Sequence, residues 1–245
     1  MAGIQADFIK ITDVGNWVYH VQLNRPKQMN AFNHQLFAEM KMVFEKLDDE
    51  PACRVIVLSG IGRAFTAGLD LGDDAARMSR ATRRRILRMQ NSVTAIEKCC
   101  KPVIVAMHGY SIGAGLDVAG ACDIRVCSRD TKFAVREVAI GISAGLGVLN
   151  RLPQAVGNVS WLREMAYTAR MCDAAEAKEY GLVSHIYDSY DAMMEASIQM
   201  AAAIAANSPV AVQANWNMSQ LHTEDIPKSA IAVQKKGEKP TFSKL

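Results

Sequence analysis

Two glycine-rich turns contain the residues whose types and spacing could do chemistry. The first, Gly62–Leu71, reads GRAFTAGLDL, and the second, His108–Asp117, reads HGYSIGAGLD. Each follows an apolar run that is expected to be a strand, and the second is expected to open a helix. Backbone N–H groups at a helix start have no partner inside the helix, and the helix dipole adds positive potential there. Such turns could stabilise a carbonyl oxygen that becomes negative during a reaction, because glycine lets a ligand approach the backbone closely.

Neither turn matches a familiar phosphate-binding pattern. Both lack the GxxxxGK[ST] spacing, which excludes a P-loop. The second turn also lacks GxGxxG followed by an acidic residue at the distance that a dinucleotide-binding fold requires. Taken singly, each turn is better explained as an ordinary connection between a strand and a helix, so a functional interpretation depends on the rest of the chain.

The elements that would position these turns alternate between strands and helices. Strands are expected at residues 8–12, 18–23, 54–59, 103–107 and 123–127. Helices are expected at residues 34–47, 73–98 and 116–121, and the chain from residue 146 onward is expected to be mostly helical. This order predicts an α/β fold with a parallel-type sheet, followed by a helical segment.

Composition narrows the possible function classes. The 245 residues fit one large domain or one domain with a small appendage, and half of them are apolar. A net charge of +3 does not favour a nucleic-acid partner, and no apolar run is long enough to predict a membrane span. The six cysteines are scattered without CxxC spacing, so we expect reduced thiols and no metal site.

Several motifs, in order, resemble the crotonase (enoyl-CoA hydratase/isomerase) superfamily. They are LNRP at 23–26 with Asn30-Ala31, AFTAGLDL at 64–71, GYSIGAGLD at 109–117, ACDIR at 121–125, and FAVREVAIGISAGLGVLNRLP at 133–153. The segments 216–219, 223–226 and 241–245 resemble the end of peroxisomal and mitochondrial dienoyl-CoA isomerases more specifically. The resemblance covers nearly the whole chain. It implies an α/β crotonase-type spiral of β-β-α units over residues 1–190, with a helical C-terminal region over residues 191–245.

The resemblance also implies an oxyanion hole in the two turns. Its backbone N–H groups would belong to Leu69 and Ala114 and would hold the carbonyl oxygen of a coenzyme A thioester. The acyl-CoA site would be lined by Ala114 and by Ala67, Gly68, Leu69, Asp70 and Leu71. Lys27, next to the LNRP motif, would contact a coenzyme A phosphate, although a plain surface lysine is an equal alternative.

Two carboxylates match acidic positions of the family. Glu137 stands at the main catalytic position, and its neighbours Val135, Val138, Ile140 and Ile142 are apolar, which tends to raise a carboxyl pKa. The alternative for Glu137 is a surface carboxylate beside Arg136. Asp117 matches a second acidic position of the dienoyl isomerases. Its alternative is a residue that merely stabilises the start of its helix.

The chain departs from the family pattern at three places. Dienoyl isomerases carry an aspartate eight residues after the main glutamate, and here that position is Gly145. The loop after Leu71 is shorter than usual, and about a helix's worth of residues is missing between residues 213 and 215. Moving two double bonds calls for two proton-transfer groups, so we expect the missing aspartate to affect catalytic activity. We expect the shorter segments to affect coenzyme A affinity and the assembly of subunits.

We therefore expect an isomerase that converts 3,5-dienoyl-CoA to 2,4-dienoyl-CoA in fatty acid β-oxidation. A 3,2-enoyl-CoA isomerase, an enoyl-CoA hydratase or a non-catalytic acyl-CoA-binding paralogue are the alternatives. No cofactor is expected beyond the coenzyme A of the substrate. The resemblance implies a homo-trimer or hexamer. The terminal Ser243-Lys244-Leu245 predicts a peroxisomal import receptor as partner, with the mitochondrion as a second location implied by the family.

A basic run within the expected helix at 73–98 has two further interpretations. Its arginines are Arg77, Arg80, Arg83, Arg84, Arg85 and Arg88. They could form a solvated helix face or attract the phosphates of coenzyme A. Binding of RNA would call for interleaved aromatic residues or a larger basic excess, and the sequence has neither.

Overall fold

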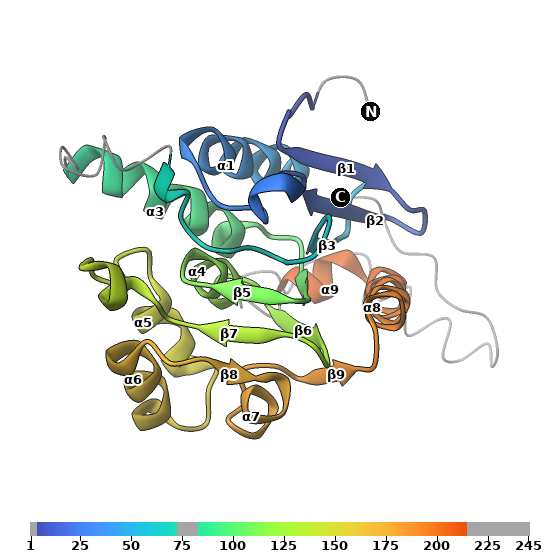
Figure 1. Ribbon diagram of the computed structural model, residues 1–245. Coiled ribbons are helices and arrows are strands. Elements are labelled where there is room, and N and C mark those ends of the chain that lie inside the picture. Colours follow the sequence, from blue (N-terminus) through green and yellow to red (C-terminus); the bar gives the residue numbers. More distant parts are fainter. Residues whose placement is uncertain (1–3, 73–82, 215–245) are drawn as a thin grey trace, which may run out of the picture.

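A six-stranded sheet runs through the computed structural model, which describes residues 4–72 and 83–214 (Figure 1). Its strand order is β1-β2-β3-β4-β6-β9. The strands are β1 (Ile9–Asp13), β2 (Val18–Leu23), β3 (Val55–Gly60), β4 (Val103–Met107), β6 (Ile124–Ser128) and β9 (His185–Tyr187). β1 is antiparallel to β2, and every other neighbouring pair is parallel.

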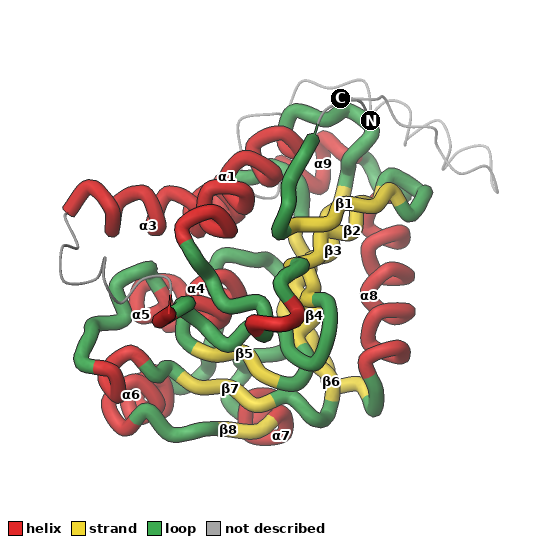
Figure 2. The backbone as a smooth tube through the Cα atoms, turned by 45° about the horizontal axis from the view of Figure 1, so that its top comes forward, coloured by secondary structure: helices red, strands yellow, loops and turns green. Residues whose placement is uncertain are grey.

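Both faces of this sheet are buried by helices, which explains why β3 reads as a continuous apolar run. Val55 and Val57 of β3 pack in a cluster with Met193 of helix α8 (Tyr190–Ala205). Ile56 and Leu58 point the other way, toward the side of helices α1 (His34–Asp48), α3 (Arg83–Lys98) and α4 (Ala114–Gly120). Figure 2 shows α8 on one side of the strands and α1, α3 and α4 on the other. Parallel strands covered on both faces need no alternation of polar residues.

A second sheet of three short strands lies beside the first. β5 (Tyr110–Ile112) is parallel to β7 (Lys132–Ala134), which is antiparallel to β8 (Cys172–Asp173). The chain passes from β4 to β5 and α4, and then from β6 to β7, so that strand pairs wind into a spiral. The bend between β4 and β5 needs Gly109, whose φ is +60° and where a Cβ would lie 2.1 Å from the Arg63 carbonyl oxygen.

Two short strands of the second sheet differ from what the sequence predicts. The segment Gly109–Gly115, expected as a turn, contains β5, and β7 was not expected at all. The region after residue 146 is mostly helical, as expected, and also contains the short strands β8 and β9. Strands of two or three residues are too short to produce a period-two pattern, so only pairing with distant strands defines them. Part of the helix expected at 73–98 lies outside the described residues.

The remaining described helices are each ten residues long or shorter. They are α5 (Val148–Arg151), α6 (Val159–Thr168), α7 (Ala174–Glu179) and α9 (Pro209–Ala214), with 3-10 turns η1 (Pro26–Gln28), η2 (Glu137–Ile140) and η3 (Leu152–Gln154). Among the described helices, none is both long and apolar enough to cross a membrane. The division at residues 190 and 191 stays a prediction; α8 begins at Tyr190.

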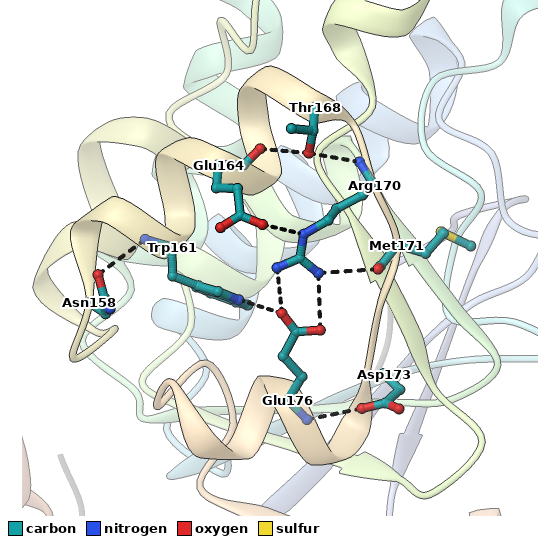
Figure 3. A network of polar contacts seen from close by, with 8 residues as sticks. All are labelled: Asn158, Trp161, Glu164, Thr168, Arg170, Met171, Asp173 and Glu176. Atoms are coloured by element: carbon teal, nitrogen blue, oxygen red, sulfur yellow. Dashed lines mark hydrogen bonds and ion pairs between the residues drawn. The ribbon is translucent and has the colours of Figure 1, made fainter.

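A polar network joins α6 to α7 beside β8 (Figure 3). Arg170 donates to Glu164 at 2.7 Å and forms two hydrogen bonds with Glu176, one of them 3.0 Å long. The Trp161 indole also donates to Glu176, at 2.8 Å. Arg170 accordingly lowers the pKa of Glu176. The ions are partly exposed, so each pair contributes less than about 1 kcal/mol, and the network mainly fixes how the two helices meet.

Candidate active site

The two glycine turns, far apart in the sequence, lie against each other. Thr66 pairs with Ser111 in a short parallel bridge. In this bridge the Thr66 N–H donates to Tyr110 at 2.9 Å, and the Ile112 N–H donates to the Thr66 carbonyl at 3.2 Å. A Cβ on Gly68 would lie only 3.0 Å from the Ile112 carbonyl oxygen. Contact this close places Gly68 directly beside the residues that lead into α4.

The backbone N–H of Leu69 has a defined direction. The Gly68 carbonyl accepts from the Phe32 N–H at 2.7 Å, and the Asp70 N–H donates back to the Phe32 carbonyl at 3.0 Å. In a trans peptide the C=O and the following N–H point in opposite directions. The Leu69 N–H therefore points away from Phe32, and within residues 4–72 and 83–214 no acceptor receives it.

The N–H of Ala114 is similarly available. Ala114 is the first residue of α4 and is almost fully buried. The N–H groups of Leu116 and Asp117 turn back to the Gly113 carbonyl, whereas that of Ala114 has no acceptor in the described part of the chain. Buried backbone donors are nearly always paired, so the N–H of buried Ala114, next to that of partly buried Leu69 on the adjacent turn, indicates a position for a ligand oxygen.

Glu137 is buried next to these donors. It begins η2, and its side chain is only slightly exposed. A Cβ on Gly113 would lie 3.1 Å from the Glu137 Oε1 atom, so the carboxylate sits against the residue before Ala114. Burial raises the pKa of Glu137. Its Oε2 atom has no hydrogen-bond partner among the described residues.

The expected cause of this burial was only partly right. Val135 is buried, but Val138 and Ile140 are each 46% exposed and cannot shield the carboxylate. The carboxylate is instead covered by Gly113, which lies between β5 and α4 and packs against Glu137. Arg136, the neighbour in the surface alternative, is exposed while Glu137 is not.

Asp117 is a second buried carboxylate, one turn into α4 from Ala114. Its Oδ1 atom accepts from the Val148 N–H at 2.7 Å, and its Oδ2 atom has no partner among the described residues. Burial, and then the charge of Glu137, raise the pKa of Asp117 to about 7, against the opposing effects of Val148 and Arg151. The repulsion between the two carboxylates favours a state in which one of them holds a proton.

Asp117 should make the protein less stable as the pH rises toward neutrality. Its pKa is about 7 in the folded chain and 3.8 in an unperturbed aspartate, so between these values the native state binds more protons than the unfolded state. The free energy of unfolding then falls with rising pH, by at most about 4 kcal/mol for this group. Asp117→Asn removes this contribution to the slope, because asparagine does not titrate.

Urea denaturation of the wild type and Asp117→Asn across this pH range measures the difference. We expect the variant to gain stability relative to the wild type as the pH rises. Asp188→Asn, at an aspartate whose side chain is 82% exposed, serves as the control and should follow the wild-type curve. Parallel curves for wild type and Asp117→Asn would show that the Asp117 pKa is not raised.

The other predicted substrate-binding residues have different surroundings. Asp70 forms a largely buried ion pair with Arg25 at 2.9 Å, so its carboxylate is already used within the protein. Ala67 donates its N–H to the Met29 carbonyl at 2.9 Å. Leu71 is 44% exposed, and Lys27 lies on the surface in η1. The structure thus brings Gly68, Leu69, Ala114, Asp117 and Glu137 together and leaves Leu71 and Lys27 at the surface.

Gly145 has no backbone reason to be glycine. It is exposed, and a Cβ there would meet nothing nearer than Ser143 at 3.7 Å. Its carbonyl accepts from Gln90 at 2.7 Å. The residue lines an open cavity of about 760 Å³ that also contains Thr94 and Arg151. A longer side chain therefore fits at this position.

The basic face of α3 is only partly described. Arg77 and Arg80 lie outside the described residues, while Arg83, Arg84 and Arg88 are exposed. Arg85 and Arg88 line a cavity of about 330 Å³ between α3 and α1, together with His34 and Lys41. The basic side chains around this cavity agree with a solvated helix face and equally with attraction of coenzyme A phosphates.

Two buried polar side chains, those of Asn30 and His108, hold the first turn in place. Asn30 is fully buried with φ of +55°, and its amide donates to the carbonyls of Ile61 at 3.0 Å and Ala64 at 2.9 Å. His108 lies with Nε2 2.8 Å from the Gly62 carbonyl oxygen. Asn30 belongs to the motif at 23–31 and His108 begins the second turn, but only the fold decides which groups these side chains bind.

The sequence of the chain is similar to one protein family and to several named proteins. Residues 13–244 match the family described as Enoyl-CoA hydratase/isomerase. The human protein named Delta(3,5)-Delta(2,4)-dienoyl-CoA isomerase, mitochondrial, is 42% identical over 271 residues, covering 97% of this chain and 83% of the relative. The peroxisomal protein of the same name from Arabidopsis thaliana is 38% identical, covering 93% of each chain.

A solved structure confirms the expected α/β architecture. An enoyl-CoA hydratase from Bacillus anthracis superposes with a TM-score of 0.90 at 28% identity, covering 98% of this chain and all of that one. The alignment with the human relative spans 271 residues, more than the 245 of this chain. The chain therefore lacks internal residues that this relative has, in agreement with the expectation of shortened segments.

Proposed function

The chain belongs to the enoyl-CoA hydratase/isomerase (crotonase) family, and on that premise we propose that it isomerises 3,5-dienoyl-CoA to 2,4-dienoyl-CoA in fatty acid β-oxidation. Relatives from animals and a plant that carry this activity in their names cover almost the whole chain. The observation that carries the proposal is the pair of N–H groups, of Leu69 and Ala114, that have no acceptor among the described residues and lie beside the buried carboxylate of Glu137.

The proposed reaction is a transfer of protons around a stabilised dienolate. The thioester carbonyl oxygen accepts hydrogen bonds from Leu69 and Ala114, which lowers the cost of the charge that develops there. Ionised Glu137 removes a proton from C2, and protonated Asp117 delivers one to C6 as the double bonds move. Proton exchange between the two carboxylates, or with solvent, then restores the starting state. Burial raises the pKa of both carboxyl groups, and the pKa of Asp117, at about 7, suits proton exchange near neutral pH.

A 3,2-enoyl-CoA isomerase is the second candidate, favoured by Gly145. The shorter shift of one double bond can be managed by a single carboxylate, which Glu137 supplies. Hydration normally uses two carboxylates and is a further alternative. A non-catalytic acyl-CoA-binding paralogue is favoured by the shortened chain rather than by the site.

Turnover of three substrates separates these functions. Purified protein is incubated with 3,5-dienoyl-CoA, 3-enoyl-CoA and 2-enoyl-CoA, and product formation is followed by absorbance and mass spectrometry. We expect the highest kcat/KM with the dienoyl substrate. Faster conversion of 3-enoyl-CoA would favour the second candidate. Binding of coenzyme A thioesters without turnover of any of them would contradict every enzymatic function.

The proposed partners follow from the same family membership. We propose acyl-CoA as the substrate, with Ala67, Gly68, Asp70 and Leu71 along its path and Lys27 at a phosphate. A homo-trimer or hexamer is proposed as the assembly. Light scattering coupled to size exclusion tests it, and a monomeric mass at micromolar concentration would contradict it.

Import into peroxisomes is proposed from Ser243-Lys244-Leu245 and from the peroxisomal relative in Arabidopsis. An N-terminally tagged chain should co-localise with a peroxisomal marker, and removal of these three residues should leave it in the cytosol. Substituting Thr241 and Phe242 by alanine gives a matched control that keeps the signal. Unchanged import after the removal, or uptake into mitochondria, would contradict the proposed address.

A further inference from the structure

Thr66 is a fully buried polar residue at the centre of the first turn. Its hydroxyl donates to the Asn30 carbonyl at 2.8 Å and accepts from the Gly68 N–H at 3.1 Å. The hydroxyl thus uses its donor and an acceptor position at the same time, which leaves it one orientation. It connects the buried Asn30 to the peptide immediately before Gly68.

Gly68 is the point at which the first turn could change conformation. Its φ is +94°, and glycine without a Cβ has several backbone conformations of similar energy. Two tethers restrict it, one on each side. The Thr66 hydroxyl holds the Gly68 N–H, and the Phe32 N–H holds the Gly68 carbonyl. Because that carbonyl shares a peptide plane with the Leu69 N–H, the tethers together set the direction of the Leu69 donor.

The same side chain also contacts the second turn. A Cβ on Gly115 would lie 2.6 Å from the Thr66 methyl carbon, so this methyl group packs directly against the second residue of α4. Gly115 follows Ala114, whose N–H is the other donor without an acceptor among residues 4–72 and 83–214. The Thr66 hydroxyl therefore helps to orient the Leu69 N–H. The Thr66 methyl group sets the distance between this N–H and that of Ala114.

We propose that Thr66 is a positioning residue for the oxyanion hole, its hydroxyl holding the Leu69 N–H on the substrate carbonyl and its methyl group setting the distance to α4. The inference rests on the proposed function only in requiring a thioester carbonyl at Leu69 and Ala114. It assigns no proton transfer to Thr66. Because a donor displaced by a fraction of an ångström affects the transition state more than binding, the effect should appear mainly in kcat.

Three substitutions separate the hydroxyl from the shape of the side chain. Thr66→Val keeps the branched shape and loses both hydrogen bonds. Thr66→Ser keeps the hydroxyl and loses the methyl group. Thr66→Cys offers a weaker hydrogen-bonding group and remains informative should Thr66→Val not fold. Circular dichroism and thermal unfolding establish that each variant is folded before it is assayed.

The first readout is the division between kcat and KM. We expect Thr66→Val to lower kcat for 3,5-dienoyl-CoA by roughly 10- to 100-fold, with KM changed by less than about threefold. Thr66→Ser should retain kcat within about fivefold of wild type, and Thr66→Cys should fall between the two. A general loss of folded protein would instead lower kcat for all variants in proportion to the active fraction.

The second readout does not depend on turnover. A bound 2,4-dienoyl-CoA has a conjugated thioester, and hydrogen bonds to its carbonyl shift its ultraviolet absorption to longer wavelength. We expect this shift in the wild type and Thr66→Ser and its reduction in Thr66→Val. A Thr66-dependent shift in a protein that does not isomerise 3,5-dienoyl-CoA would support the inference while contradicting the proposed reaction.

The opposite results overturn the inference. If Thr66→Val retains both the shift and kcat within about twofold, the hydroxyl does not position the donor, even though the enzyme isomerises its substrate. Equal losses of kcat in Thr66→Val and Thr66→Ser would also overturn it, because the hydroxyl would then make no difference.

Discussion

Replacing Glu137 by glutamine should lower kcat for 3,5-dienoyl-CoA by about 10²- to 10⁴-fold, the usual contribution of a positioned acid or base. Glutamine has nearly the same shape and can fill the space beside Gly113, where a Cβ would lie 3.1 Å from the Glu137 carboxylate. It cannot accept the C2 proton. KM should change little, because the proposed contacts with the thioester come from backbone N–H groups.

Glu179→Gln provides the matched control for this substitution, since Glu179 is an exposed glutamate at the end of α7. It should leave kcat and KM unchanged. Stopped assays with excess enzyme would measure the residual rate of Glu137→Gln. A variant with kcat within about threefold of wild type would exclude Glu137 as the principal acid or base. The stability of Glu137→Gln should equal or exceed that of the wild type, because burial of the carboxylate raises its pKa and opposes its charge.

Introducing an aspartate at Gly145 should increase turnover of the dienoyl substrate. The side chain fits, because among the described residues a Cβ there meets only Ser143, at 3.7 Å, and the residue lines an open cavity. The surrounding loop leads to Val148, whose N–H binds Asp117, so the new carboxylate joins a loop already anchored at the site. The proposed reaction leaves proton delivery at C6 to Asp117 alone, and a further positioned carboxylate would share that delivery. A positioned acid or base typically contributes about 10²- to 10⁴-fold, so we expect a gain of at least about tenfold in kcat.

The substrates distinguish this effect from a general improvement. Gly145→Asp should accelerate the conversion of 3,5-dienoyl-CoA, which requires proton delivery far from C2, and leave 3-enoyl-CoA turnover unchanged. Gly145→Asn and Gly145→Ala restore bulk without acidity and should behave as the wild type. Equal gains with aspartate and asparagine would mean that side-chain volume matters rather than proton transfer. No gain with aspartate would mean that the new carboxylate takes no part in proton delivery and that Asp117 carries it out unaided.

Much of the fold was readable from local patterns because the long elements have strong periodic signals. The helix at α1 ends within one residue of its expected limits, and the buried strands β3 and β4 were expected from their apolar runs. The short strands β5, β7 and β8 were not, since each has at most three residues and owes its existence to partners elsewhere in the chain. Sequence periodicity carries no signal over so few residues.

The sequence by itself determined the family, the two glycine turns and the identity of the acidic residues, because these depend on residue types and their order. Only the tertiary structure decided how they act together. The Leu69 N–H has no acceptor in the described part of the chain because Phe32 holds the preceding carbonyl and turns this N–H away. Thr66, in the first turn, pairs with Ser111 of the second turn, so that two distant segments meet there. Glu137 is buried by the second turn and not by its apolar neighbours Val138 and Ile140, which face solvent. Burial and hydrogen-bond direction are properties of segments brought together by folding, so no local pattern could specify them.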